Sequence, residues 1–119
     1  MDAAEIIYPD HTFHIACAVQ SAHHWSQRED VLSEVHRVLR PGGKFYIYEA
    51  DSTLEDIPEG WVARRGAWPP SSLVRWNWQR YGMDDEAWTE LKNAVQASPF
   101  GGGEDGRHGF YRRMVLTRS

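Results

Sequence analysis

The chain has little of what marks secreted, membrane-spanning or nucleic-acid-binding proteins. Its 119 residues include one cysteine, Cys17, so no disulfide can form within a single chain. No apolar run approaches the roughly 20 residues that cross a bilayer, and no secretory leader is recognisable. Acidic residues outnumber basic ones by 17 to 13, so the charge lacks a nucleic-acid footprint. We therefore expect a single cytoplasmic domain that binds neither membrane nor nucleic acid.

The clearest pattern lies in residues 12–51, TFHIACAVQSAHHWSQREDVLSEVHRVLRPGGKFYIYEAD. Residues 13–19 form a short apolar run typical of a strand buried on both faces, which would also bury Cys17. Ser26 followed three residues later by Glu29 predicts a capping box at the start of a helix. Apolar residues then recur at helical spacing over residues 28–40, so one face of that helix should be buried.

Pro41 should end this helix, and Gly42 and Gly43 should let the chain reverse into a second apolar run at residues 45–50. Two buried strands joined by a helix and short turns predict parallel neighbours in one sheet. The first half of the chain therefore predicts one strand–helix–strand crossover.

The second half of the chain is predicted from its punctuation. Residues 51–70 are rich in proline, glycine and mixed charge, which indicates a lid-like insertion. A helix is predicted at residues 71–81, and a further one at residues 84–97 with Asp84 as its N-cap. Residues 100–109 are a glycine-rich connection, and residues 110–118 are a mixed strand suited to a sheet margin. The buried face of the second of these helices should carry Trp88, Leu91 and Val95.

Several stretches resemble the C-terminal half of the class I S-adenosylmethionine-dependent methyltransferase domain, small-molecule type. The matching pieces are residues 10–24, DHTFHIACAVQSAHH, residues 34–43, EVHRVLRPGG, and the strand at residues 44–49. Residues 2–10, DAAEIIYPD, resemble the acidic stretch before the family's fourth strand. Residues 110–118 fit its closing strand, which runs antiparallel beside the fifth. The combination of paired histidines and an RVLRPGG helix end is more specific than either piece alone.

The resemblance implies an α/β fold, a partial Rossmann-like methyltransferase sheet in one domain over residues 1–119. Its parallel strands are expected at residues 12–19 and 44–50 and its antiparallel C-terminal strand at 110–118. Helices are expected at about 27–40, 71–81 and 84–97. Two features depart from the family pattern. His14 stands where the family has an acidic residue. The family's N-terminal glycine-rich motif is lacking, because the glycines present do not follow a strand and open a helix in the required order. The acidic residue that ends the family's second strand is lacking as well.

The cofactor implied by the resemblance is S-adenosylmethionine, although binding by this chain alone is in doubt without the glycine-rich motif. The residue matching Asp2 accepts a hydrogen bond from the adenine amino group, and the backbone at Ala3 addresses the ring edge. Ala18 and Val19 pass beside the methionine part of the cofactor. For Asp2, a frayed and solvated terminus is the alternative.

The resemblance assigns the acceptor side to residues that follow the two parallel strands. His23 is the candidate general base, because the pKa of imidazole lies near working pH. The predicted substrate contacts are Gln20, His24, Glu49, Trp61 and Trp68. Packing or capping remains the alternative for the histidines and tryptophans. Glu49 and the adjacent Asp51 could instead cap the turn that follows.

A metal site is not predicted. The histidines at positions 11, 14, 23 and 24 form two pairs that lack acidic or thiol partners at known ligand spacings. A phosphate cradle at residues 100–109 is also not predicted, because no helix follows that stretch.

Two classes of function stay open. The chain is either part of an enzyme that transfers a methyl group from S-adenosylmethionine to a small molecule, or a non-catalytic dimerising or small-ligand-binding module derived from one. Without the cofactor-gripping half, we expect an isolated chain to be inactive. The strand at residues 12–19 should then expose an unpaired apolar edge. We expect this edge to pair with a second copy, forming a homodimer, or with a separate chain that supplies the N-terminal half.

Overall fold

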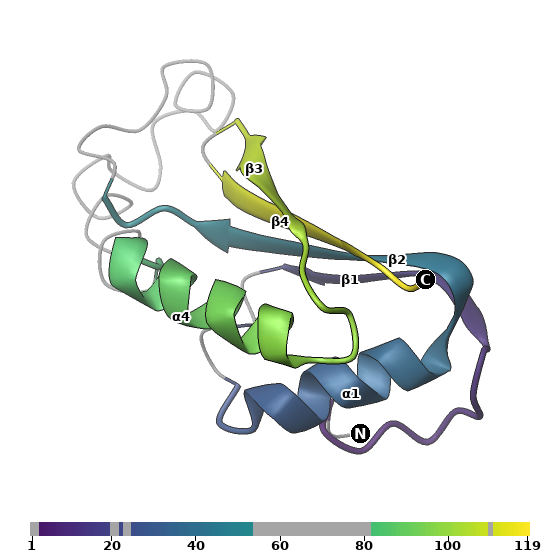
Figure 1. The fold of residues 1–119 in the computed structure, drawn as a ribbon. Helices are drawn as coiled ribbons and strands as arrows, with labels where there is room; N and C mark the ends of the chain where they lie inside the picture. Colours follow the sequence, from purple (N-terminus) through teal and green to yellow (C-terminus); the bar gives the residue numbers. More distant parts are fainter. Residues whose placement is uncertain (1–2, 20–21, 23–24, 54–81, 110) are drawn as a thin grey trace, which may run out of the picture.

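The computed structural model describes residues 3–19, 22, 25–53, 82–109 and 111–119 (Figure 1). The predicted helix at residues 71–81 and most of the predicted lid at 51–70 lie outside these residues. The described elements, in chain order, are β1 (Phe13–Val19), α1 (Arg28–Val38), β2 (Leu39–Ala50), α4 (Asp85–Ala97), β3 (Glu104–His108) and β4 (Tyr111–Thr117).

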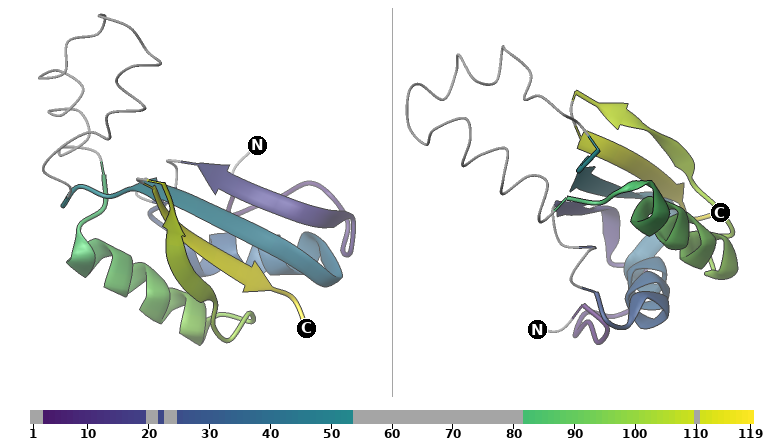
Figure 2. Two further views of the ribbon diagram at one scale, coloured as in Figure 1. Left: turned by 90° about the horizontal axis from the view of Figure 1, so that it is seen from above. Right: turned by 90° about the vertical axis from the view of Figure 1, so that its left-hand side faces the viewer.

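The four strands form one sheet in the order β1-β2-β4-β3. β1 runs parallel to β2, and β4 runs antiparallel to β2, so both predicted strand directions are confirmed. Both α1 and α4 lie against the same face of the sheet (Figures 1 and 2). The core between the sheet and these helices includes Leu32, Phe45, Ile47, Leu91, Met114 and Leu116.

Helix α1 buries the predicted apolar stripe, since Val31, Leu32, Val35 and Val38 are buried. The predicted capping box is wrong, because the N-cap is Gln27 and no side chain caps the helix. The acidic residues of the first turn still complement the positive end of the helix dipole.

The end of α1 differs from the prediction at residue 40. The helix stops at Val38, and Leu39 already has extended dihedral angles of φ −79° and ψ 143°. Pro41 prevents continuation of the helix, because its ring disfavours helical geometry at Arg40 and it has no amide to donate to the Arg37 carbonyl oxygen. β2 consequently begins at Leu39, earlier than the predicted start of the strand.

The turn at the start of β2 depends on two glycines. Gly42 has a φ of +82°, the left-handed region that suits glycine. At Gly43 the reason is space, because a Cβ atom would lie 2.8 Å from the Arg40 carbonyl oxygen and 3.1 Å from that of His14. The predicted reversal is thus confirmed, and Gly43 additionally allows β1 to approach closely.

The prediction that residues 13–19 are buried on both faces is wrong. Ile15 is 64% exposed, Val19 is 57% exposed and Cys17 is also exposed. Ala16 and Ala18 alternate with them and pack against the core. Two facts explain the difference: β1 is the edge strand of the sheet, and the described helices cover one face of it.

One strand, β3, was not predicted from the sequence. Residues 100–109 were expected to be a connection, yet they contain β3, which pairs antiparallel with β4. Its sequence, EDGRH, has no apolar side chain, so no hydrophobic pattern signals it. Gly109, at φ +63°, follows His108, and His108 is the register partner of Tyr111. β4 is therefore an interior strand and not the predicted sheet margin.

The helix after Asp84 is confirmed. The Asp84 side chain accepts a hydrogen bond from the Ala87 amide at 2.8 Å, and Trp88, Leu91 and Val95 are buried. Neither α1 nor α4, the helices in the described part of the chain, has the length and apolar character needed to cross a membrane.

Replacing Gly43 with alanine should destabilise the fold by roughly 1–3 kcal/mol, because the new methyl group would press on two backbone oxygens that cannot easily move. Gly106→Ala is the matched control, since nothing lies within 4 Å of a Cβ at that strand position. Urea unfolding of both variants measures the difference. Equal midpoints would contradict the close approach at Gly43.

Candidate functional site

The carboxyl ends of the two parallel strands, β1 and β2, lie side by side at one end of the sheet. Val19 of β1 and Tyr48 of β2 are register partners, so both strands finish at this end. Because β4 runs the other way, its first residue, Tyr111, lies opposite Ala50. The turn between β3 and β4 therefore reaches the same place. We call this region the carboxyl edge, and ligands bind there in open α/β sheets.

Glu49 connects the end of β2 to the segment that follows β1. Its carboxylate oxygen Oε1 accepts a hydrogen bond from the Ala22 amide at 2.7 Å, and neither residue has exposed surface. This contact fixes Ala22, which lies in the sequence between Gln20 and His23. Direct contact between Glu49 and a substrate stays a prediction, because its observed bond is to the chain itself.

The other predicted site residues fall into two groups. Ala18 is half-buried and Val19 exposed at the end of β1, while Ala3 is exposed near the N-terminus. The remainder lie outside the described residues, so their predicted roles are untested: Asp2, Gln20, His23, His24, Trp61 and Trp68.

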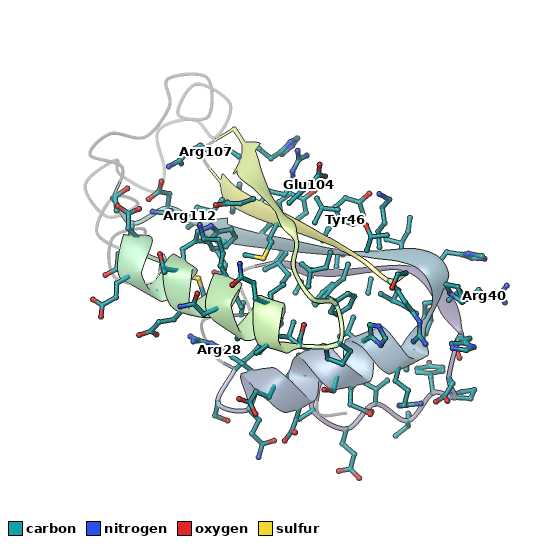
Figure 3. All side chains as sticks on the ribbon, viewed as in Figure 1. Arg28, Arg40, Tyr46, Glu104, Arg107 and Arg112 are labelled. Carbon is teal, nitrogen blue, oxygen red and sulfur yellow. The ribbon has the colours of Figure 1, made fainter. Side chains whose placement is uncertain are left out.

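An ion-pair network centred on Asp51 lies at the carboxyl edge, directly after the end of β2. Asp51 is fully buried, and its two carboxylate oxygens lie 2.9 Å from Arg112 NH2 and 2.6 Å from Arg107 NH1. The same Arg112 nitrogen lies 2.6 Å from Asp85 Oδ1 in the first turn of α4. Figure 3 shows Arg107 and Arg112 beside the start of α4. The network joins β2, β3, β4 and α4.

The charge of Asp51 follows from these contacts. Burial acts to raise the pKa of its carboxyl group, but the Thr53 hydroxyl and amide donate to it and Arg107 and Arg112 lie close. The opposing contributions win, and the pKa lies below its ordinary value. Asp51 is therefore ionised at neutral pH, and its bonds from Thr53 match the capping role considered from sequence.

Arg107 and Arg112 were missed by sequence reasoning. A signal for Arg112 was present, because residues 112, 114 and 116 share one face of β4 and two of them are the buried Met114 and Leu116. A charge on an apolar face implies a buried partner. Arg107 gave no such signal, since it lies on a strand that the pattern did not reveal.

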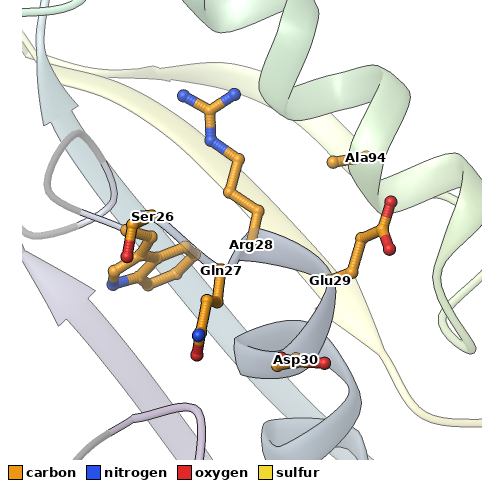
Figure 4. A pocket seen from close by; sticks show the side chains of 7 residues that line it. Ser26, Gln27, Arg28, Glu29, Asp30 and Ala94 are labelled. Atoms are coloured by element: carbon orange, nitrogen blue, oxygen red, sulfur yellow. The ribbon is translucent and has the colours of Figure 1, made fainter.

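A pocket of about 500 Å³ opens between the first turn of α1 and α4 (Figure 4). It is lined by Trp25, Ser26, Gln27, Arg28, Glu29, Asp30 and Ala94. Glu49, the one predicted substrate contact among the described residues, is not part of this lining. Its lining mixes a cation with two carboxylates, so it has no clear preference for a ligand of either charge.

The predicted cofactor contacts Ala18 and Val19 lie at the carboxyl end of β1 on opposite faces of the strand, Ala18 packed against the core and Val19 exposed. Their contact with a cofactor stays a prediction. Among the described glycines, Gly109 alone combines a positive φ with a place at this edge, and it belongs to the β3–β4 turn rather than to the end of β1. Within the described ranges, no three His, Cys, Asp or Glu side chains gather as a metal site would require.

Replacing Asp51 with asparagine should cost roughly 3–5 kcal/mol of unfolding free energy, because Arg107 loses its counter-charge and the buried Arg112 keeps only the exposed Asp85. Arg107→Gln is the control and should cost at most about 1 kcal/mol, since Arg107 is half exposed. Urea unfolding at pH 7 tests both. Similar losses in the two variants would contradict the buried network.

The pH dependence supplies a second test of Asp51. Because its pKa is lowered on folding, its contribution is present above the unfolded value, near 3.8, and is lost as the pH falls through the folded value. We expect the acid-induced loss of stability to be smaller in Asp51→Asn than in the unaltered chain. Parallel curves for the two would contradict this assignment.

Comparison with known proteins agrees with this architecture. Residues 1–47 match the family model described as a methyltransferase domain. The chain is 41% identical over 59 residues to 27-O-demethylrifamycin SV methyltransferase of Amycolatopsis mediterranei, covering 50% of this chain and 21% of that protein. It is 39% identical over 94 residues to sterol methyltransferase-like 1 of Botryococcus braunii, covering 78% and 22%.

Solved structures share the fold over the whole chain. A protein of Methanococcus maripaludis, proposed to be an S-adenosyl-L-methionine-dependent methyltransferase, superposes with a TM-score of 0.72 at 16% identity. A SAM-dependent methyltransferase of Aquifex aeolicus gives a TM-score of 0.64 at 18% identity. All of this chain is covered in both cases, against 52% and 53% of those proteins.

The chain thus spans about half of these structures and about a fifth of the two curated relatives. The family match and the strand order of the sheet both support the similarity to methyltransferases, and so does the carboxyl edge. Residues 1–47 of this chain are thus similar to a methyltransferase domain, and the chain as a whole shares the fold of about half the length of the solved S-adenosylmethionine-dependent methyltransferases.

Proposed function

We propose that this chain forms the acceptor side of a domain that transfers a methyl group from S-adenosylmethionine to a small molecule. The observation that carries the proposal is the carboxyl edge, where the ends of β1 and β2 meet in a sheet of order β1-β2-β4-β3. The methyltransferase match over residues 1–47 includes β1 and most of β2.

Each predicted site residue has a proposed role. When bound, S-adenosylmethionine supplies an electrophilic methyl group. Ala18 and Val19 line the methionine part, and Asp2 and Ala3 address the adenine ring. Gln20, His24, Trp61 and Trp68 surround the acceptor. His23 takes the proton from the acceptor oxygen or nitrogen, and the main contribution of the protein is to hold the acceptor in line with the methyl group.

Glu49 supports this arrangement through its bond to Ala22, which restrains the segment that carries the proposed base. The glycine-rich turn that would grip the other side of the cofactor has no counterpart among the described residues. We therefore propose a truncated domain that transfers no methyl group on its own and becomes active when a further segment or chain supplies that turn. A cytoplasmic location is supported by the single exposed thiol of Cys17.

The alternative is a non-catalytic module that dimerises or binds a small ligand. The exposed side chains of β1 favour a role in association, because Ile15, Cys17 and Val19 form an uncovered apolar row on the edge strand. The strand holds neither proline nor a charged side chain, the usual protections of an edge. We propose that β1 pairs through its free edge with β1 of a second copy in the antiparallel sense, or with a strand of a separate chain that supplies the N-terminal half.

Cofactor binding is tested by titrating the chain with millimolar S-adenosylmethionine and following the backbone amides by NMR. We expect shifts at Ala18, Val19 and Ala22. Val19→Arg should weaken binding at least tenfold, because a long cationic side chain would occupy the space proposed for the methionine part of the cofactor. Ile15→Arg is the matched control, on the same exposed face of β1 but away from the carboxyl edge.

If the unaltered chain shows no shifts, this chain does not contact the cofactor by itself, and the binding-module alternative gains weight. Loss of binding in both arginine variants would place the cofactor elsewhere.

Association is tested with Cys17, the one cysteine of the chain. Two-fold pairing of β1 strands centred near this residue brings two sulfur atoms within reach of a short bismaleimide. We expect efficient cross-linked dimers and a dimer mass by light scattering at micromolar concentration. The matched control moves the thiol to exposed Ser33 on α1 by the double change Cys17→Ser, Ser33→Cys. A monomer by light scattering, or equal cross-linking of both proteins, would rule out the pairing.

A further inference from the structure

We propose that Glu34 and Arg37 are positioning residues that clamp the N-terminal segment onto α1 and so place the start of the chain for cofactor binding. The clamped segment is residues 6–12, which begins three residues after Ala3, the nearer of the predicted adenine contacts. The inference rests on the proposed function, because it explains how the cofactor-facing end of the segment is held.

Arg37 holds the segment with both terminal nitrogens of its guanidinium group. NH2 donates to the Ile6 carbonyl oxygen at 2.8 Å, and NH1 donates to the Tyr8 carbonyl oxygen and to Asp10 Oδ1, both at 2.9 Å. Three acceptors from three residues of an otherwise irregular stretch thus converge on one side chain. A lysine could not reproduce this, because its ammonium is a single point of donation without a planar fork.

Glu34 fixes Arg37 and also binds the segment directly. Its two carboxylate oxygens accept from Arg37 Nε and NH2, each at 2.9 Å, and Oε2 also accepts from the Ile6 amide at 2.8 Å. The two residues lie three apart on α1, so their side chains share one face of the helix. The hydrogen bonds from Arg37 and from the Ile6 amide lower the pKa of Glu34 to about 2, so it stays ionised at any physiological pH.

The other end of the segment is held by the C-terminal end of α1. The amides of His11 and Thr12 donate to the carbonyl oxygens of Arg37 and Val38 at 3.0 and 2.7 Å. These oxygens lack partners within the helix, as the last carbonyls of any helix do. His11 adopts φ +56°, an uncommon conformation for a residue with a side chain, which bends the chain into β1.

Two anchors therefore define the path of the segment, one at Ile6 and one at residues 11–12. Ala3 lies three residues before the first anchor, so the clamp limits how far this part of the chain can move from the fold. Glu34 and Arg37 are part of the EVHRVLRPGG stretch on which the family resemblance rests. The arrangement gives that stretch a task beyond packing, namely the placement of the chain that precedes β1.

The test replaces Arg37 with lysine, which keeps the charge and removes the fork. Arg40→Lys is the matched control, the same change at an exposed arginine three residues further on. Amide hydrogen exchange measured by NMR should be at least tenfold faster at Ile6 in Arg37→Lys than in the unaltered chain, with α4 amides unchanged. Affinity for S-adenosylmethionine should fall at least threefold in Arg37→Lys and stay constant in Arg40→Lys.

The outcomes separate the two proposals. Unchanged exchange at Ile6 overturns the clamp. Faster exchange with unchanged cofactor affinity shows a merely structural clamp and overturns the positioning role, while the proposed function stands. No cofactor binding by the unaltered chain overturns both the proposed function and the link between clamp and cofactor. An equal loss of affinity in Arg40→Lys would assign the effect to the exchange of arginine for lysine in general and overturn the specific role of Arg37.

Discussion

β2 is hydrogen-bonded along both of its edges, to β1 in the parallel sense and to β4 in the antiparallel sense. This two-sided pairing is the constraint on which the rest of the structure depends. It sets the registers of β1 and β4, and through β4 it sets that of β3. It also decides that the ends of β1 and β2 lie beside the start of β4. Glu49 and Asp51 owe their places at the carboxyl edge to this register.

The sheet is covered unevenly, and this bears on what the chain does. α1 and α4 cover one face, whereas the other face carries the exposed row on β1 and the half-buried Tyr46 and Tyr48 on β2. Figure 3 shows Tyr46 on the side of the sheet away from the helices. The solved methyltransferases that share this fold are about twice as long.

Some residues of the candidate site could be predicted from the sequence pattern, whereas others are identified only by their contacts in the structure. Glu49 was anticipated because it ends an apolar run, which places it at the carboxyl end of a strand. Its bond to Ala22 could not be anticipated, since it joins residues 27 positions apart. Arg107 and Arg112 escaped notice for a related reason. Their partner, Asp51, is more than 50 positions away, and a charge balance between distant residues leaves no local mark in the sequence.

Local pattern by itself determined the strand–helix–strand unit, the N-cap at Asp84, the turn at Gly42 and the resemblance to methyltransferases. Each of these depends on residues that are close in the chain, through helical spacing, the fixed φ of proline or the freedom of glycine. Tertiary structure alone decided that β1 is exposed on one face, that EDGRH forms a strand, and that Arg37 binds the segment before β1. Burial and backbone pairing depend on which neighbours are present, and local composition does not specify those neighbours.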